Sequence, residues 1–209
     1  MRRMATLVLV SCLAGVRAPA GSVQEASLLL DQAYGPRESL TNQGNTTLTR
    51  FAAARPQGLG VRYGWDFGSF LARDVAMAAG VDFTWHPPSS ARLTASGAAA
   101  GDYQYQYWGL GLHAATATVL NLFAGLDLRS EKLTLDPVSG AGGSTRLVRP
   151  WVKGGAGWLS GLAPIRPFFR LEAAAPLSPQ ANGSLGSGDD ARRALAPRFQ
   201  VAFNAGIRF

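Results

Sequence analysis

Two histidines are the residues of this 209-residue chain best suited to catalysis or metal binding. His86 is closely followed by Ser89 and Ser90, and a histidine beside a serine can act as the base for a hydroxyl nucleophile. The pair has no evident acid to orient the ring, and no GxSxG motif is present. Structural zinc usually takes four Cys or His ligands. We therefore expect no enzymatic activity, metal or cofactor, with His86 at the outer end of a strand and His113 as an internal hydrogen-bonding residue.

A second group of candidates consists of charged side chains of both signs that recur on one face of alternating stretches. They are Arg62, Asp66, Asp82, Asp127, Arg129, Lys153, Arg170, Glu172 and Arg198. Glycines such as Gly60, Gly64 and Gly111 share that face and would leave room for the long arginine side chains. Because an unpaired buried charge is costly, a closed interior would require these charges to pair with one another.

The elements that must position these side chains are strands, because apolar and polar residues alternate with a period of two. In the clearest stretch, 195–209, residues such as Val201 and Phe203 alternate with polar or small ones. Eight strands are predicted, near 26–34, 59–67, 75–85, 108–114, 120–128, 148–158, 169–177 and 195–209. Leu28, Leu29 and Leu30 break the alternation in the first, and residues 48–55 could pair with the second strand instead.

The connections between these strands alternate strictly between long and short. The long ones are rich in Ser, Thr, Asn, Gly and Pro, and they cover residues 35–57, 87–102, 134–145 and 178–194. The short ones cover 68–73, 115–118 and 159–164. Long loops at one end and tight turns at the other are typical of an up-and-down barrel in a membrane.

Composition excludes several classes of protein. Only 16% of residues are charged, against about 25% in soluble domains, while 47% are hydrophobic and 25 are Gly. These values argue against disorder and against a helical bundle. The basic residues are scattered without a zinc-finger or RNA-binding motif, so we expect no nucleic-acid partner.

Residues 1–20 have the features of a secretory signal peptide. Arg2 and Arg3 precede the uncharged run 4–16, and small residues at 18 and 20 suit cleavage before Gly21. Residues 1–20 contain three of the 20 basic residues and no acid, so residues 21–209 keep 17 basic and 13 acidic residues and no cysteine. A membrane-surface anchor and lipidation of Cys12 remain alternatives. Residues 21–209 are expected to form one barrel domain.

Alternation alone does not decide which face of the barrel looks inward. The glycines on the polar face, and the presence there of both positive and negative side chains, favour a polar interior. Aromatic residues near strand ends, such as Trp85 and Trp158, suit a membrane interface. A soluble, lipocalin-like periplasmic barrel would bury the apolar face instead.

The signal peptide, the eight strands and the ending FQVAFNAGIRF resemble small bacterial outer-membrane β-barrels of the OmpA membrane-domain and OmpX kind. The resemblance implies a monomer in the bacterial outer membrane. It also implies that Phe209, Ile207 and Phe203 belong to a signal read by the barrel assembly machinery. The chain stops at this strand, so the peptidoglycan-binding domain of full-length OmpA is not expected.

For such a barrel we expect a structural or surface-interaction role, with a lumen filled by polar side chains. A narrow channel for small solutes is an alternative, although eight strands leave an interior just wide enough for side chains. Lys132 and Arg146 flank the third long loop on the lipid-facing parity, where they could contact lipopolysaccharide phosphates. Alternatively, both side chains snorkel to the headgroups without a specific ligand.

Overall fold

The structure is a computed structural model that describes residues 23–35, 39–43, 47–53, 55–72, 75–137, 143–161, 164–178 and 192–209. The predicted signal peptide and the proposed lipidation site at Cys12 lie outside the described residues. No helix among the described residues is long and apolar enough to cross a membrane.

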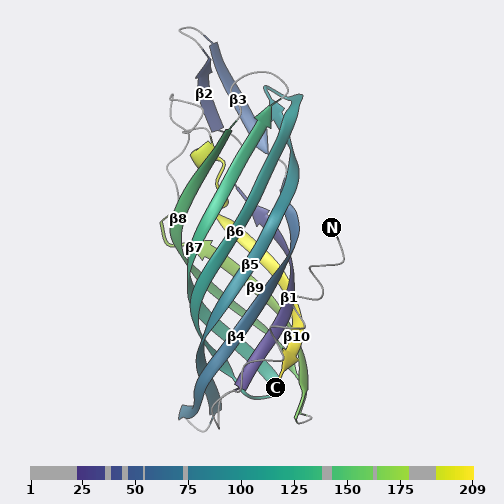
Figure 1. Cartoon of the computed structure of the whole chain (residues 1–209), viewed down its shortest axis with the longest axis vertical. Helices are drawn as coiled ribbons and strands as arrows, with labels where there is room; N and C mark the ends of the chain where they lie inside the picture. Colours follow the sequence, from purple (N-terminus) through teal and green to yellow (C-terminus); the bar gives the residue numbers. More distant parts are fainter. Residues whose placement is uncertain are drawn as a thin grey trace.

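Eight antiparallel strands close into a barrel, as Figure 1 shows. They are β1 (Val23–Tyr34), β4 (Gln57–Ala72), β5 (Val75–Ala95), β6 (Ala98–Thr116), β7 (Leu120–Pro137), β8 (Gly143–Leu159), β9 (Arg166–Pro176) and β10 (Phe199–Arg208). Each strand pairs with the next in this order, and β1 pairs with β10 to complete the circle. The predicted eight-stranded up-and-down barrel is confirmed.

The first predicted strand is confirmed as β1, which lies between β10 and β4. Its irregular pattern has a simple cause, because Leu28 and Leu30 point outward while Leu29 is buried inside the barrel. The alternative pairing of residues 48–55 with the second strand is wrong. In that region β2 (Ser39–Gln43) and β3 (Thr47–Ala53) form a hairpin, and the end of β3 pairs with the end of β5.

The long loop expected at 87–102 is wrong, because β5 and β6 continue through it as one tall hairpin. The hairpin turns at Ser96 and Gly97, whose φ angles of 48° and 87° match a two-residue turn with both residues in the left-handed region. The two prolines after His86 fall in a register shift between His86 and Ser89. Proline is tolerated at such a bulge, so its presence did not end the strand.

The lower part of the barrel is the part nearer the C-terminus, which is marked near the bottom of Figure 1, and large apolar side chains point outward there. They include Leu59, Leu110, Leu112, Leu120, Leu122, Leu126, Leu128, Val152, Leu171, Phe203 and Ile207. The interior at the same level holds buried charged and amide side chains. This is the inverse of a lipocalin-like barrel, and it is the arrangement expected of a barrel surrounded by lipid.

The polarity reverses farther along the strands, and β7 shows the change clearly. Up to Leu128 its outward residues are leucine or alanine, whereas Lys132, Thr134 and Asp136 point outward beyond Ser130. The inward residues change in the opposite sense, from Asp127 to the buried Leu133 and Leu135. The upper part of the barrel therefore has an apolar core and a polar exterior, like a protein in water.

The upper core is closed by the segment that precedes β10. Leu195 and Ala196 are buried there against Tyr103, Tyr105, Leu133, Leu135 and Leu147. The Tyr103 hydroxyl donates to the Leu195 carbonyl at 3.3 Å, and an Arg149 nitrogen donates to the Pro197 carbonyl at 2.8 Å. Burial raises the pKa of Tyr103, so the phenol remains a neutral donor. The mouth of the barrel is thus covered by its own chain.

Candidate functional site

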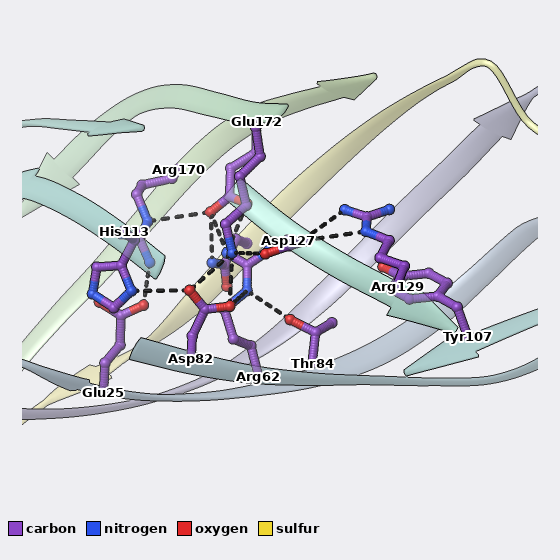
Figure 2. Close-up of polar contacts among 12 residues, drawn as sticks. Glu25, Arg62, Asp82, Thr84, Tyr107, His113, Asp127, Arg129, Arg170 and Glu172 are labelled. Atoms are coloured by element: carbon purple, nitrogen blue, oxygen red, sulfur yellow. Dashed lines mark hydrogen bonds and ion pairs between the residues drawn. The ribbon is translucent and has the colours of Figure 1, made fainter. Parts of the chain in front are cut away.

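The centre of the lumen is an ion cluster around Lys153 of β8. Its ammonium donates to both oxygens of Asp82 at 2.7 and 2.8 Å and also contacts Asp127. All three side chains are buried. Gly111 makes the space, because a Cβ there would lie 2.9 Å from the Lys153 Nζ and still closer to Asp127. Three strands thus place one cation between two carboxylates, those of Asp82 and Asp127, which are labelled in Figure 2.

A second pair crosses the barrel from β4 to β9. Arg62 Nη1 lies 2.9 and 2.8 Å from the two oxygens of Glu172, and Arg62 Nε donates to the Thr84 hydroxyl at 3.2 Å. The Asn204 amide donates to the same carboxylate at 2.8 Å. Arg170 also lies beside Glu172, at 3.4 Å, as Figure 2 shows. These contacts join strands that are far apart in sequence.

His113 lies between two carboxylates at the lower side of this network. Its Nδ1 is 2.9 Å from Asp82, and its Nε2 is 2.8 Å from Asp66. Each ring nitrogen thus faces a carboxylate oxygen, so His113 of β6 links Asp82 of β5 to Asp66 of β4. Arg208 of the last strand also binds Asp66. His113 is the internal hydrogen-bonding residue that the sequence suggested.

Above the centre, Arg129 lies between two aromatic rings. Its guanidinium is 4.5 Å from the Tyr107 centroid and 4.3 Å from that of Trp151, within the range of cation–π attraction. It donates to Asp127 at 3.2 and 3.1 Å, and to Gln200. The fully buried Trp151 therefore closes the lumen at this level.

His86 does not lie at the rim, contrary to the expectation from sequence. It is 1% exposed inside the barrel, where its ring stacks on Tyr107 with centroids 5.1 Å apart. Its Nε2 is 2.9 Å from Asp31, the acid that the sequence did not reveal. The Ser89 hydroxyl donates to a backbone carbonyl at 3.1 Å, and Ser90 points outward.

Two further charged residues, Asp31 and Arg149, are buried in the lumen without having been predicted there from the sequence. Arg149 donates to the fully buried Glu131 at 2.6 and 2.7 Å, and that carboxylate also accepts from Tyr105 at 2.7 Å. Arg149 lies four residues before Lys153 on the same strand and therefore on the same face, so alternation along the strand could have identified it. Asp31 follows the irregular leucine run, where parity gave no clear signal.

The structure places eight of the nine selected charged residues inside the barrel. They are Arg62, Asp66, Asp82, Asp127, Arg129, Lys153, Arg170 and Glu172. Arg198 is half-buried just before β10, and its backbone N–H donates to the Tyr34 carbonyl at 2.7 Å. Within the described ranges, no group of three or more His, Cys, Asp or Glu side chains is arranged to hold a metal ion.

One cavity lies among these side chains, bounded by Arg62, Arg129, Lys153 and Glu172, and it measures about 10 Å³. That is room for about one water molecule.

The remaining selected residues lie on the outer wall. Lys132 and Arg146 point outward and stand directly opposite each other in the pairing of β7 with β8. Phe203, Ile207 and Phe209 are exposed at the lower end of the barrel. The backbone of Phe209 exchanges two hydrogen bonds with Gln24, of 2.7 and 2.9 Å, so the final residue is part of the closed wall.

The chain matches no protein-family model and no curated protein sequence. Its similarity to solved structures is one of fold. Ail, the attachment invasion locus protein of Yersinia pestis, matches at 13% identity with a TM-score of 0.47, covering 90% of this chain and 99% of that chain. Its complex with the heparin analogue sucrose octasulfate matches with the same coverage at 12% identity and a TM-score of 0.49.

Neisserial surface protein A matches at 12% identity with a TM-score of 0.44, covering 92% of this chain and 98% of that chain. The strand pairing of this chain, taken by itself, has the architecture that the sequence resemblance implied, a closed eight-stranded up-and-down β-barrel.

Proposed function

We propose that this chain is an integral β-barrel of the bacterial outer membrane with a structural or surface-interaction role. The observation that carries the proposal is an apolar band between two aromatic levels. Trp158 pairs with Leu120 of β7, and Trp108 pairs with Ser130, ten residues farther along that strand. A transmembrane strand needs about 9–11 residues, and aromatic side chains favour both interfaces. The band therefore has the height of a bilayer core.

The direction of insertion follows from the two ends of the barrel. The short connections after Thr116 and after Leu159 lie at the same end as the last residue, Phe209 (Figure 1). Outer-membrane barrels keep their short turns in the periplasm. The upper part, with its apolar core and polar wall, would then project outside the cell.

This projecting part is suited to contact with a partner, because hydrogen-bonded strands and a packed core hold it in one shape. The β5–β6 hairpin carries the paired end of β3 along its edge, and the segment before β10 covers its mouth. Exposed loops on a rigid scaffold are frequent sites of recognition. The proposed role needs neither a cofactor nor a catalytic residue.

Transport through the barrel is not part of this proposal. The lumen is crossed by side-chain ion pairs, blocked by the buried Trp151 and covered by Leu195. These features argue against the alternative of a narrow channel. The pairing of β1 with β10 also closes the wall, which favours a monomer because the membrane-spanning sheet has no free edge strand.

The proposal is tested by fractionation, gel mobility and conductance. We expect the protein in the outer-membrane fraction, with an unheated band that shifts in mobility after boiling. Purified protein in a planar bilayer should give no steady conductance above the lipid background. A soluble periplasmic protein without a mobility shift would contradict the membrane assignment, and regular single-channel steps would contradict the closed lumen.

A further inference from the structure

Two basic residues on the outer wall face each other without a counter-ion. Lys132 and Arg146 are direct cross-strand partners, and like charges in that position repel. No described residue forms a hydrogen bond or ion pair with the side chain of either residue. The nearest residue in the same row is the neutral Gln106, opposite Lys132. The repulsion between the two like charges lowers the stability of the fold, and an anion bound from outside the chain would relieve it.

The outward acids lie too far along the strands to neutralise this pair. Asp102 and Asp136 stand opposite each other on β6 and β7, four residues beyond Gln106 and Lys132. At about 3.3 Å per residue, that separation is roughly 13 Å. Asp102 also stands opposite a different cation, Arg92 of β5. Charges that far apart on an exposed surface are largely screened.

The basic pair lies in a groove on the outer wall of about 300 Å³. Besides the two cations, its lining includes Trp85, Trp108, Gln106 and Ser130, and also the buried His86 and Tyr107. The indoles are 47% and 49% exposed and are direct partners across β5 and β6. Indoles prefer the headgroup level of a membrane, because they combine an apolar ring with one polar N–H. The groove therefore combines cations, hydrogen-bonding groups and flat apolar faces at the membrane surface.

An apolar furrow of about 590 Å³ begins next to this groove on the membrane side. The next outward residues on three of the same strands, Phe83, Leu110 and Leu128, line it. No charged side chain is exposed in it, since the carboxylates of Asp82 and Asp127 point into the lumen. A ligand that reaches from the groove into this furrow must be an amphiphile.

We propose that this groove and furrow form one binding site for the phosphorylated glycolipid of the outer leaflet, lipopolysaccharide. A phosphate would lie between Lys132 and Arg146, sugar rings would pack on the Trp85 and Trp108 faces, and an acyl chain would follow the furrow. The proposal rests on the outer-membrane location proposed above. It differs from snorkelling, which positions each cation independently and requires no groove beside it.

The test uses the full mature protein, folded in detergent and mixed with purified lipopolysaccharide, with bound lipid counted by native mass spectrometry. The double variant Lys132→Gln and Arg146→Gln should bind about tenfold to a hundredfold more weakly, because it loses two charge-assisted contacts. Arg92→Gln is the matched control, a cation on the same outer wall outside the groove, and it should bind like the parent. Equal binding by the parent and the double variant would overturn the proposal.

Three further ligands separate the sources of a phosphate. We expect weaker binding of enzymatically dephosphorylated lipopolysaccharide and of phosphatidylglycerol, and no measurable binding of inorganic phosphate. Binding of phosphatidylglycerol at the strength of lipopolysaccharide would overturn the glycolipid assignment. The mobility shift on boiling is recorded for every variant. A normal shift without lipid selectivity refutes only this site, whereas absence of the shift in the parent refutes the membrane proposal.

Discussion

Removal of Lys153 should destabilise the barrel from its centre, and Lys153→Met tests this without a large change in volume. The ammonium touches Asp82 twice, at 2.7 and 2.8 Å, and Asp127 once, with all three side chains about 1% exposed. Breaking a buried ion pair by removing one partner typically costs about 3–5 kcal/mol. Asp82 keeps Arg62 at 3.8 Å, and Asp127 keeps Arg129 at 3.1 Å. We therefore expect the lower end, about 3 kcal/mol.

The assay is urea unfolding of the refolded protein in lipid vesicles, followed by the fraction of the compact band on an unheated gel. Val152→Ala is the control, because Val152 is the neighbouring residue on β8 and points outward. It should cost less than about 1.5 kcal/mol. Adding Asp127→Asn to Lys153→Met should recover about 1 kcal/mol or more, because it removes one of the two buried carboxylates that have lost the Lys153 ammonium. A loss below about 1 kcal/mol for Lys153→Met would refute the view that these charges depend on one another.

Three shorter predictions address packing, the lipid face and assembly. Gly111→Ala should cost about 1–3 kcal/mol in the same unfolding assay, since its Cβ would collide with the central ion cluster. Gly154→Ala, whose nearest contact would be 3.5 Å away, should be nearly neutral, and equal losses would contradict this account of the lumen. Leu126→Lys places a charge in the apolar band and should cost about 2–4 kcal/mol, whereas an unchanged midpoint would contradict a lipid-facing position. Phe209→Ala should reduce the fraction of the protein in cells that shifts in mobility on boiling, without affecting refolding in detergent. An unchanged fraction would contradict the role of Phe209 in a signal for barrel assembly.

The strand architecture could be predicted from sequence because each barrel strand follows the period-two rule locally. The same rule failed at residues 87–102, where two prolines and several serines have the composition of a loop. The structure accommodates the prolines in a bulge, and Leu93 returns to the interior beyond it. Composition alone does not reveal that a register shift lets a strand continue.

The partners inside the lumen could not be predicted, although the inward residues could. Arg62 and Glu172 are 110 positions apart, and their contact depends on the registers of all the strands between them. The reversal of polarity above Ser130 could not be predicted for a different reason. Alternation along a strand separates two faces but does not tell which solvent each face meets, and in the proposed orientation the solvent changes from lipid to water along β7.

The central claim is that β7 passes from lipid to water at Ser130 while its inner face stays closed. The one cysteine of the chain is Cys12, so single cysteines can be introduced into the mature protein and spin-labelled. Labels at Leu122 and Leu128 should be accessible to oxygen in the lipid, and a label at Lys132 should be accessible to a water-soluble nickel chelate. A label at Leu133 should be protected from both. Access of the chelate to Leu122 or Leu128, or of lipid oxygen to Leu133, would contradict the account.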